Sequence, residues 1–331
     1  MNSADLAIGV DVGGTRIKAG LVDRAGHLVE SSGRDSPGRL TDPAEAVEAT
    51  VGVVHALLRR LDRATAIVGV GVGVAGFVDG DQGEVVFAPH LAWRNEPLAE
   101  VLRARLGLPV VVDNDANAAA WGELRFGAGR GVRHLVMVTL GTGIGGALVV
   151  DGQLWRGAGG LAGEFGHMVV VPQGRACECG NHGCWEQYAS GSVLRRSGRA
   201  ILRGGGPRAS ALLGLCGEDA DRLSGQDVTS AARAGDPAAL EAIEEVGGWL
   251  GVGLANLAGA LDPSGFVVGG GVSEAGELLL VPARAALAAQ LPGRGYRPLP
   301  WVRAAALGAQ AGVVGAADLV RHRQRSPSDR M

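Results

Sequence analysis

The chain has 331 residues, of which 47% are hydrophobic and 20% charged, so it is long enough for two domains with cores of their own. Its formal net charge is −3 without a basic tail or stripe, which argues against a nucleic-acid partner. No run of 18 apolar residues predicts a membrane span, and the N-terminus lacks the pattern of a signal peptide. Four cysteines, three of them clustered, fit a reducing cytoplasmic location better than a disulfide framework.

Strands alternate with helices in the first part of the chain. Residues 6–12 and 15–22 predict a hairpin that turns at Gly13-Gly14, and a third strand follows near 27–32. Further strands are expected at 67–74 and 109–113, and helices at 43–62, 96–106 and 115–125. Thr41-Asp42-Pro43 supplies the cap and first turn of the first helix. This alternation predicts an α/β domain with a mixed or parallel sheet.

A glycine-rich stretch near residue 127 marks the expected domain boundary. A second hairpin, 134–140 and 145–150, follows it. Beyond the hairpin we predict helices at 192–203, 225–234, 237–260, 276–291 and 308–323, and strands at 265–269 and 300–304. The sequence therefore predicts an N-terminal domain of residues 1–126, completed by the helix 308–323, and a C-terminal domain of residues 127–307.

The two glycine hairpins share a strand–turn–strand plan about 130 residues apart, a weak internal repeat that suggests two similar halves. Glycine turns expose consecutive backbone N–H groups, which can bind phosphate. Asp11 precedes the first turn and is a candidate ligand for hydrated Mg²⁺. A Walker A loop is excluded, because the chain's one lysine, Lys18, is followed by alanine.

Two stretches, 71–76 and 141–146, match the dinucleotide-binding pattern G-x-G-x-x-G. That pattern binds a pyrophosphate only where a helix begins directly after the glycines. The first match runs into FVDGDQG, which predicts a turn, and the second runs into the strand ALVV. The sequence therefore argues against a Rossmann domain.

Asp113, Asn114 and Asp115 lie where a predicted strand ends and a helix begins. Ligands are commonly bound at this edge of an α/β sheet. Asparagine and aspartate are also the preferred helix N-caps, so these side chains could instead cap the N–H groups of Asn117 or Ala118. The local sequence leaves both interpretations open.

Three of the four cysteines fall within eight positions of one another on a polar, glycine-rich stretch: Cys177, Cys179 and Cys184. A lone cysteine such as Cys216 is most simply a core residue, whereas three crowded thiols are typical of a metal site. Zinc takes about four nitrogen or sulfur ligands, and three thiolates with one imidazole form a closed structural set. The fourth ligand is His167 or His182; we favour His167, because His182 is constrained inside the cysteine loop. Metal on one ring nitrogen of His167 would leave the other for a polar ligand.

CECGNHGCWE at 177–186 fits the C-x-C-G-x-x-G-C-x-E signature of the ROK family, which comprises bacterial sugar kinases and related repressors. EFGH at 164–167 fits the E-x-G-H motif of the family's sugar kinases. The resemblance covers nearly the whole chain, from Val10 to about Gly315. ROK proteins are similar to actin-like ATPases, so the resemblance implies a two-lobed α/β fold of the ribonuclease H-like type. It also implies a cleft between the lobes and a zinc-binding loop.

The resemblance assigns roles to matching positions. DVGGT resembles the first phosphate motif of the family, LGTGIGG the second and Gly270-Gly271 the adenosine motif. The implied nucleotide-binding residues are Asp11, Gly13, Gly14, Thr15, Gly141, Thr142, Gly143, Gly270 and Gly271. The implied hexose-binding residues are Gly76, Asn114, Asp115, Glu164, His167 and Glu186, with Asp115 as the catalytic base. Arg16 and His90 depart from the family, in which lysine and asparagine are usual at these positions.

These expectations point to an ATP-dependent glucokinase that uses Mg²⁺, carries structural Zn²⁺ and forms a dimer or tetramer, as the family resemblance implies. A ROK kinase for N-acetylmannosamine, N-acetylglucosamine or fructose is the first alternative. A sugar-responsive repressor is less favoured, because such family members carry a helix-turn-helix ahead of a first strand that here begins by Leu6. A hydrolase with catalytic zinc is least favoured, because four ligands leave zinc no open position.

Overall fold

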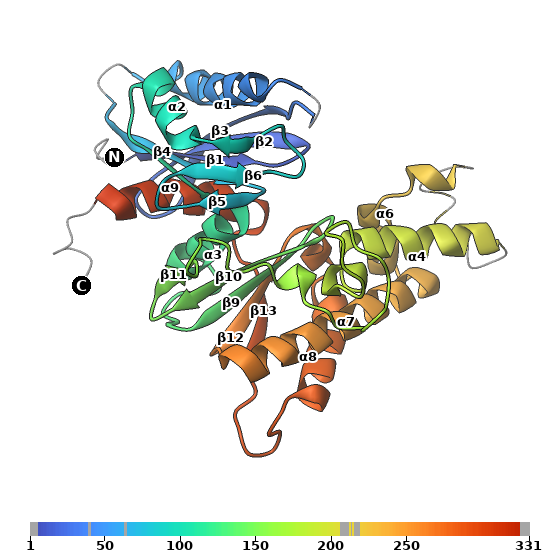
Figure 1. Ribbon diagram of the computed structural model, residues 1–331. Coiled ribbons are helices and arrows are strands. Elements are labelled where there is room, and N and C mark those ends of the chain that lie inside the picture. The colour runs from blue at the N-terminus through green and yellow to red at the C-terminus, as the bar shows by residue number, and fades with distance from the viewer. Residues whose placement is uncertain are drawn as a thin grey trace. The chain divides into compact units, whose positions relative to one another are not determined.

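A computed structural model of the chain describes residues 6–38, 41–62, 65–205, 212, 214 and 219–324 (Figure 1). Cys216, expected in the core, lies outside the described residues. The chain forms two compact units. Unit 1 comprises Met1–Arg133, Ala147–Gly163 and Ala306–Met331, and unit 2 comprises His134–Gly146 and Glu164–Ala305. None of the described helices is long and apolar enough to cross a membrane.

Unit 1 is built on a five-stranded sheet in the order β3-β2-β1-β4-β8. Its strands are β1 (Leu6–Val12), β2 (Arg16–Val22), β3 (Leu28–Asp35), β4 (Ile67–Val74) and β8 (Val110–Asn114). The first three strands are antiparallel neighbours, whereas β4 runs parallel to both β1 and β8. The predicted glycine hairpin is therefore confirmed as the β1–β2 pair, with Asp11 opposite Lys18.

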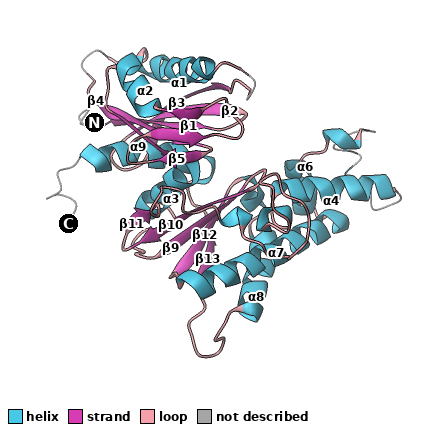
Figure 2. Ribbon diagram, viewed as in Figure 1, coloured by secondary structure: helices cyan, strands magenta, loops and turns pink. Residues whose placement is uncertain are grey.

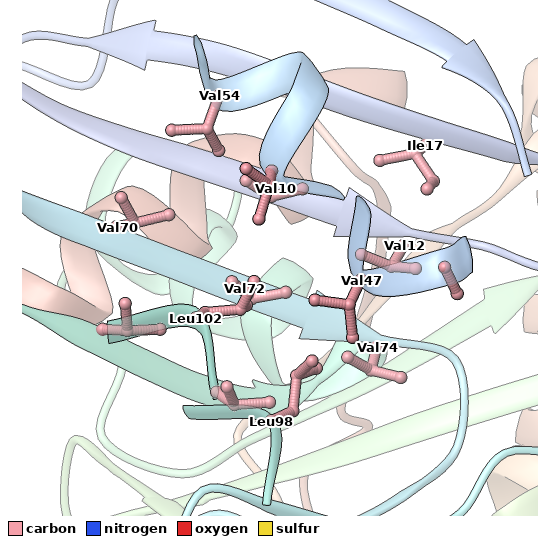
Figure 3. Packing of buried hydrophobic residues seen from close by; sticks show 14 of the residues in the cluster. Val10, Val12, Ile17, Val47, Val54, Val70, Val72, Val74, Leu98 and Leu102 are labelled. Carbon is pink, nitrogen blue, oxygen red and sulfur yellow. The ribbon is translucent and has the colours of Figure 1, made fainter. Parts of the chain in front are cut away.

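Alternation along β1 divides its side chains between two apolar layers. Ile8, Val10 and Val12 face a core shared with helices α1 (Pro43–Leu58) and α2 (Leu98–Leu106), as Figure 3 shows for part of this cluster. The predicted cap of α1 is confirmed, because the Asp42 carboxylate accepts a hydrogen bond of 2.9 Å from the N–H of Ala44.

Helices α3 (Asp115–Phe126) and α9 (Ala311–Gln324) pack against each other on the other face of this sheet. A Cβ on Gly9 or Gly71 would collide with the α9 backbone, so glycine at these two strand positions lets the helix approach the sheet closely. The C-terminal helix is thereby part of unit 1.

A small sheet of three strands follows β4 and was not predicted: β5 (Phe77–Asp79), β6 (Glu84–Phe87) and β7 (Arg94–Glu96). The stretch FVDGDQG, expected to be a turn, contains β5 before its turn begins. Strands of three or four residues carry too few alternating positions to be predicted by pattern. Because a strand and not a helix follows Gly76, the argument against a dinucleotide site still holds.

The second sheet has the order β11-β10-β9-β12-β13. Its strands are β9 (Leu135–Leu140), β10 (Ile144–Val150), β11 (Gln153–Trp155), β12 (Gly265–Gly269) and β13 (Trp301–Ala304). Strand β12 runs parallel to β9 and β13, so a hairpin followed by parallel strands recurs, as the repeated glycine hairpins suggested. Residues 147–163, predicted in the C-terminal domain, group with unit 1, where β11 packs on α3.

The helical layer of unit 2 is formed, among the described residues, by the helices named next (Figure 2). They are α4 (Gly191–Gly204), α6 (Gly225–Arg233), α7 (Pro237–Leu261) and α8 (Glu277–Gln290). Helix α7 packs along α8 and also contacts α4 and α6. Between β11 and α4 the chain forms two single-turn helices, η1 (Phe165–His167) and η2 (Trp185–Gln187), which flank the cysteine loop.

Candidate active site and metal centre

The first glycine turn, predicted to bind phosphate, connects β1 to β2 and is held by backbone and side-chain hydrogen bonds. The N–H of Gly13 donates to the carbonyl of Arg16 at 3.1 Å. The Ser36 hydroxyl donates to the Gly13 carbonyl at 2.6 Å, and the Ser36 N–H donates to the Thr15 carbonyl at 3.0 Å. A Cβ on Gly14 would lie 2.6 Å from the Cβ of His90, so this position requires glycine. The turn is thus fixed while Thr15 stays exposed.

Asp11 lies at the end of β1 beside this turn, directly across from Lys18. Burial raises the pKa of Asp11, and the positive charge of Lys18 partly offsets the rise. A nearby cation stabilises the charged form of a buried carboxylate. Asp11 is therefore a suitable ligand for the Mg²⁺ predicted from the sequence.

The strand-to-helix junction of unit 1 brings together Gly76, Asn114 and Asp115. The Asn114 side-chain oxygen caps α3 by accepting from the N–H of Ala116 at 2.8 Å and that of Asn117 at 3.0 Å. Its amide nitrogen donates to the Gly76 carbonyl at 3.0 Å. Asp115, half-buried, is the first residue of α3. The capping interpretation is thus correct for Asn114, and it places the Asp115 carboxylate at a helix N-terminus, which stabilises its charged form.

A buried ion pair supports this junction and was missed by the sequence analysis. Asp113 is only 1% exposed, and one of its oxygens accepts from Nη2 of Arg156 at 2.5 Å and from Nε at 3.0 Å. Its other oxygen accepts from the Asn117 amide and the Asn114 N–H, both at 2.9 Å. These four hydrogen bonds tie Asp113, which directly precedes the Asn114–Asp115 pair, to Asn114, Asn117 and Arg156.

The second glycine turn, Gly141-Thr142-Gly143, also predicted to bind phosphate, lies in unit 2. The Gly141 N–H donates to the Gly143 carbonyl at 3.0 Å, and the Gly191 N–H donates to the Gly141 carbonyl at 2.8 Å. The turn borders a cavity of about 300 Å³ whose wall also contains Gly271. Three residues predicted to bind the nucleotide therefore line one cavity. Gly270 keeps φ at +82°, and a Cβ there would collide with the Leu140 carbonyl.

Polar side chains that the sequence did not single out complete this cavity. They come from the starts of two helices and include Ser192, Arg195, Ser224, Gln226 and Thr229. No motif identifies these residues, because they come together only when α4 and α6 pack. A cavity that combines backbone N–H groups, an arginine and neutral hydrogen-bonding side chains suits a nucleotide.

The thiols of the cysteine loop converge with one imidazole in unit 2. Ligand atoms of His167, Cys177, Cys179 and Cys184 all lie within 4.8 Å of one another. The Sγ atoms of Cys179 and Cys184 are 3.6 Å apart, and Sγ of Cys177 is 3.8 Å from Nδ1 of His167. Four ligands about 2.3 Å from a tetrahedral zinc lie about 3.8 Å from one another, so the donors and their spacing fit zinc. His182 is not among these four residues.

Turns within the loop hold the ligands in place. The Cys177 N–H donates to the Asn181 carbonyl at 2.8 Å, and the Gly180 N–H donates to the Cys177 carbonyl at 3.0 Å. Burial raises the pKa of the Cys177 thiol to about 12, and a hydrogen bond of 3.1 Å to Glu186 Oε1 favours the same protonated form. A metal that binds this site must therefore displace thiol protons.

Glu164, His167 and Glu186 meet at the edge of the cysteine cluster. Nε2 of His167 lies 3.9 Å from Oε2 of Glu164, and Nδ1 lies 3.9 Å from Oε1 of Glu186. Because Nδ1 is the nitrogen that faces Cys177, Nε2 remains on the side of Glu164. Burial raises the pKa of Glu164, and the nearby Glu186 carboxylate adds to the rise. Three of the six residues predicted to bind the hexose are thus adjacent in unit 2.

Two sheets of matching strand order, each with a glycine turn, define an actin-like ATPase fold. The cluster of three cysteines and His167 narrows the class of protein further, because its sequence carries the ROK signature. The pattern of the ROK family matches residues 7–323, and the chain belongs to that family.

Similarity to individual ROK proteins extends over the full chain. The glucokinase of Streptomyces coelicolor is 47% identical over 316 residues, which cover 96% of this chain and 98% of that protein. A crystal structure of a ROK family glucokinase from Streptomyces griseus in complex with glucose and AMPPNP is 46% identical. It has a TM-score of 0.86, and the match covers 96% of this chain and 99% of that one. The xylose repressor of Bacillus subtilis is 29% identical over 96% of this chain and 77% of the repressor.

Proposed function

We propose that this protein is an ATP-dependent glucokinase that transfers the γ-phosphoryl group to the 6-hydroxyl of glucose and releases ADP. The observation that carries the proposal is the 47% identity to a glucokinase over nearly the full length of both chains. The structure of the similar glucokinase holds glucose together with an ATP analogue, and this supports both proposed substrates.

Asp115 is the proposed general base. Its carboxylate lies at the first position of α3, beside Asn114 whose side chain is already committed to the cap and to Gly76. A positioned carboxylate accepts the hydroxyl proton as the oxygen attacks phosphorus, and the bond to the ADP leaving oxygen breaks. Asp113 and Arg156 keep this junction in place through their hydrogen bonds.

Glu164, His167 and Glu186 are proposed to bind the sugar hydroxyls. Carboxylates accept hydrogen bonds from hydroxyls, and Nε2 of His167 can donate one while Nδ1 faces the cysteines. Zinc bound to His167 and the three cysteines would fix the tautomer and direction of this imidazole, so its role is structural.

The two glycine turns are proposed to bind the ATP phosphates. Gly13, Gly14 and Thr15 supply the turn in unit 1, and Gly141, Thr142 and Gly143 supply the turn in unit 2. The cavity beside Gly271 is the proposed adenosine site. Mg²⁺, with Asp11 as a ligand, would neutralise phosphate charge. An ATP-dependent enzyme also fits the cytoplasmic location predicted from the sequence.

A coupled assay with ATP, Mg²⁺ and a panel of glucose, fructose, N-acetylglucosamine and N-acetylmannosamine tests the proposal. We expect glucose to have the highest kcat/KM. Asp115→Asn should lower kcat by about 10²- to 10⁴-fold, because the general base is lost. Asp62→Asn, an exposed aspartate, is the matched control and should keep wild-type turnover. Ordinary turnover in Asp115→Asn would disprove the base assignment, and preference for another hexose would correct the substrate.

The protein is further proposed to form a homodimer or homotetramer, as the family resemblance implied. Light scattering after size-exclusion chromatography gives the mass in solution. A mass equal to the 33.6 kDa monomer across the working concentration range would contradict this.

A further inference from the structure

A further polar cavity lies in unit 1, and none of the residues predicted to bind nucleotide or hexose lines it. Its volume is about 360 Å³. It is bordered by the C-terminal part of α9, by α3 and by the residues around β11. The lining residues are Asp81, Trp121, Gln153, Leu154, Arg156, Leu319, His322 and Arg323. Nothing in the proposed phosphoryl transfer uses this cavity directly.

Two guanidinium groups converge in this cavity because Gly80 leaves room between them. A Cβ on Gly80 would lie 3.1 Å from Nε of Arg156 and 3.6 Å from Nη2 of Arg323. These two nitrogens therefore lie within about 7 Å of each other, so the two guanidinium groups are close enough for one phosphate to contact both. Because Nε of Arg156 already donates to Asp113, the phosphate would accept from the other N–H groups of the two guanidiniums. Their side chains are only 21% and 28% exposed, so both charges are partly removed from water.

The two arginines differ in how well nearby carboxylates balance their positive charge. Arg156 is paired with the buried Asp113. Arg323 has a long contact of 3.4 Å to Asp81, whose side chain is 92% exposed, and the charges of Asp113 and Asp79 also act on it. Burial lowers the pKa of Arg323, and repulsion from Arg156 lowers it further. An anion between the guanidiniums would relieve both effects, and the exposed Asp81 would be a weak competitor.

The lining of the cavity also contains two aromatic rings and further hydrogen-bonding groups. The rings of Trp121 and His322 are 4.7 Å apart, and Nε2 of His322 lies 3.2 Å from Oε1 of Gln153. The Trp121 indole N–H donates to the buried Asp318 at 2.9 Å, which fixes that ring. Two arginines beside rigid rings form a concave site for a small ligand that carries a phosphate group.

We propose that this cavity, between Arg156 and Arg323, binds the phosphate group of inorganic phosphate or of a small phosphate monoester. The site does not depend on the glucokinase assignment, because each residue that lines it lies in unit 1 outside the proposed substrate sites. Arg156 also pairs with Asp113, next to the Asn114–Asp115 pair, so the ligand would contact a residue that supports the catalytic junction.

Isothermal titration calorimetry of the full chain with inorganic phosphate tests the proposal. Saturating glucose and a non-hydrolysable ATP analogue fill the substrate sites beforehand. A parallel titration with glycerol 3-phosphate shows whether the free anion or an ester binds better. We expect one phosphate per chain, at least tenfold weaker binding in Arg323→Gln, and near wild-type binding in Arg323→Lys. Arg103→Gln, at an exposed arginine on α2, is the matched control and should bind like wild type.

Asp81→Asn gives a test that does not depend on losing a buried side chain. This variant removes the acid that competes for Arg323, so phosphate should bind more tightly than in wild type. The proposal is overturned if neither anion binds at tens of millimolar, or if Arg323→Gln binds phosphate as wild type does. It is overturned equally if Asp81→Asn fails to tighten binding.

Discussion

Replacement of Arg156 by methionine removes the partner of a buried carboxylate and should both destabilise unit 1 and impair catalysis. Loss of one member of a buried ion pair typically costs 3–5 kcal/mol, because the other charge remains uncompensated. Asp113 keeps its hydrogen bonds from the Asn117 amide and the Asn114 N–H, so we expect the low end, about 3 kcal/mol. At roughly 2–4 °C per kcal/mol for a domain of this size, the melting temperature should fall by about 6–12 °C.

Urea denaturation of wild type, Arg156→Met, Asp113→Asn and the double variant measures the coupling free energy between the two side chains. The double variant should recover most of the lost stability, because no buried charge is left unpaired. Arg133→Met is the control: Arg133 and Asp151 form an ion pair of 2.8 Å with side chains 74% and 64% exposed. Its loss should cost less than about 0.5 kcal/mol. If Arg156→Met lowers the free energy of unfolding no more than Arg133→Met does, the buried pair of Arg156 and Asp113 does not contribute the expected stability.

Gly143→Ala places a methyl group against the Glu186 carboxylate, so the KM for glucose should rise about tenfold, as expected for one misplaced hydrogen bond to a charged group. Gly248→Ala, in open space on α7, is its control and should leave that KM unchanged; equal values in both would contradict the role of Glu186. Cys179→Ser should lose bound zinc, measured by elemental analysis, and glucose affinity together; zinc loss with unchanged affinity would separate the two sites. Burial raises the pKa of Asp23, but hydrogen bonds from the backbone N–H groups of Ala25 and His27 hold that pKa below its ordinary value. Its stabilisation is therefore present above about pH 4 and lost as the pH falls further, so Asp23→Asn should cost about 0.5 kcal/mol at pH 7 and nothing near pH 2. A difference that persists at pH 2 would exclude a charge effect.

Most elements of the fold could be predicted, because their sequences carry local signals. The β1–β2 hairpin has alternating apolar residues on both sides of Gly13-Gly14, and α1 has Asp42 and Pro43 at its start. The grouping of residues 147–163 with unit 1 could not be predicted. It depends on contacts between β11 and α3 and on the pairing of Arg156 with Asp113, which are distant in sequence.

The residues of the candidate site likewise divide into those that the sequence predicts and those that it does not. The cysteine ligands are close in sequence and chemically distinctive, so their spacing alone predicted a metal cluster. Ser36, which holds the first glycine turn, and Gln226, which lines the proposed nucleotide cavity, carry no such signal. Serine and glutamine are common on protein surfaces, and only tertiary packing gives these two a partner.

The proposed reaction is the phosphorylation of glucose at its 6-hydroxyl with ATP. Phosphorus NMR of a reaction with ATP, Mg²⁺ and ¹³C-labelled glucose follows both the lost γ-phosphate and the position of the new ester. We expect glucose 6-phosphate and ADP to form in equal amounts. ATP hydrolysis without a sugar ester, or an ester at another hydroxyl, would contradict it.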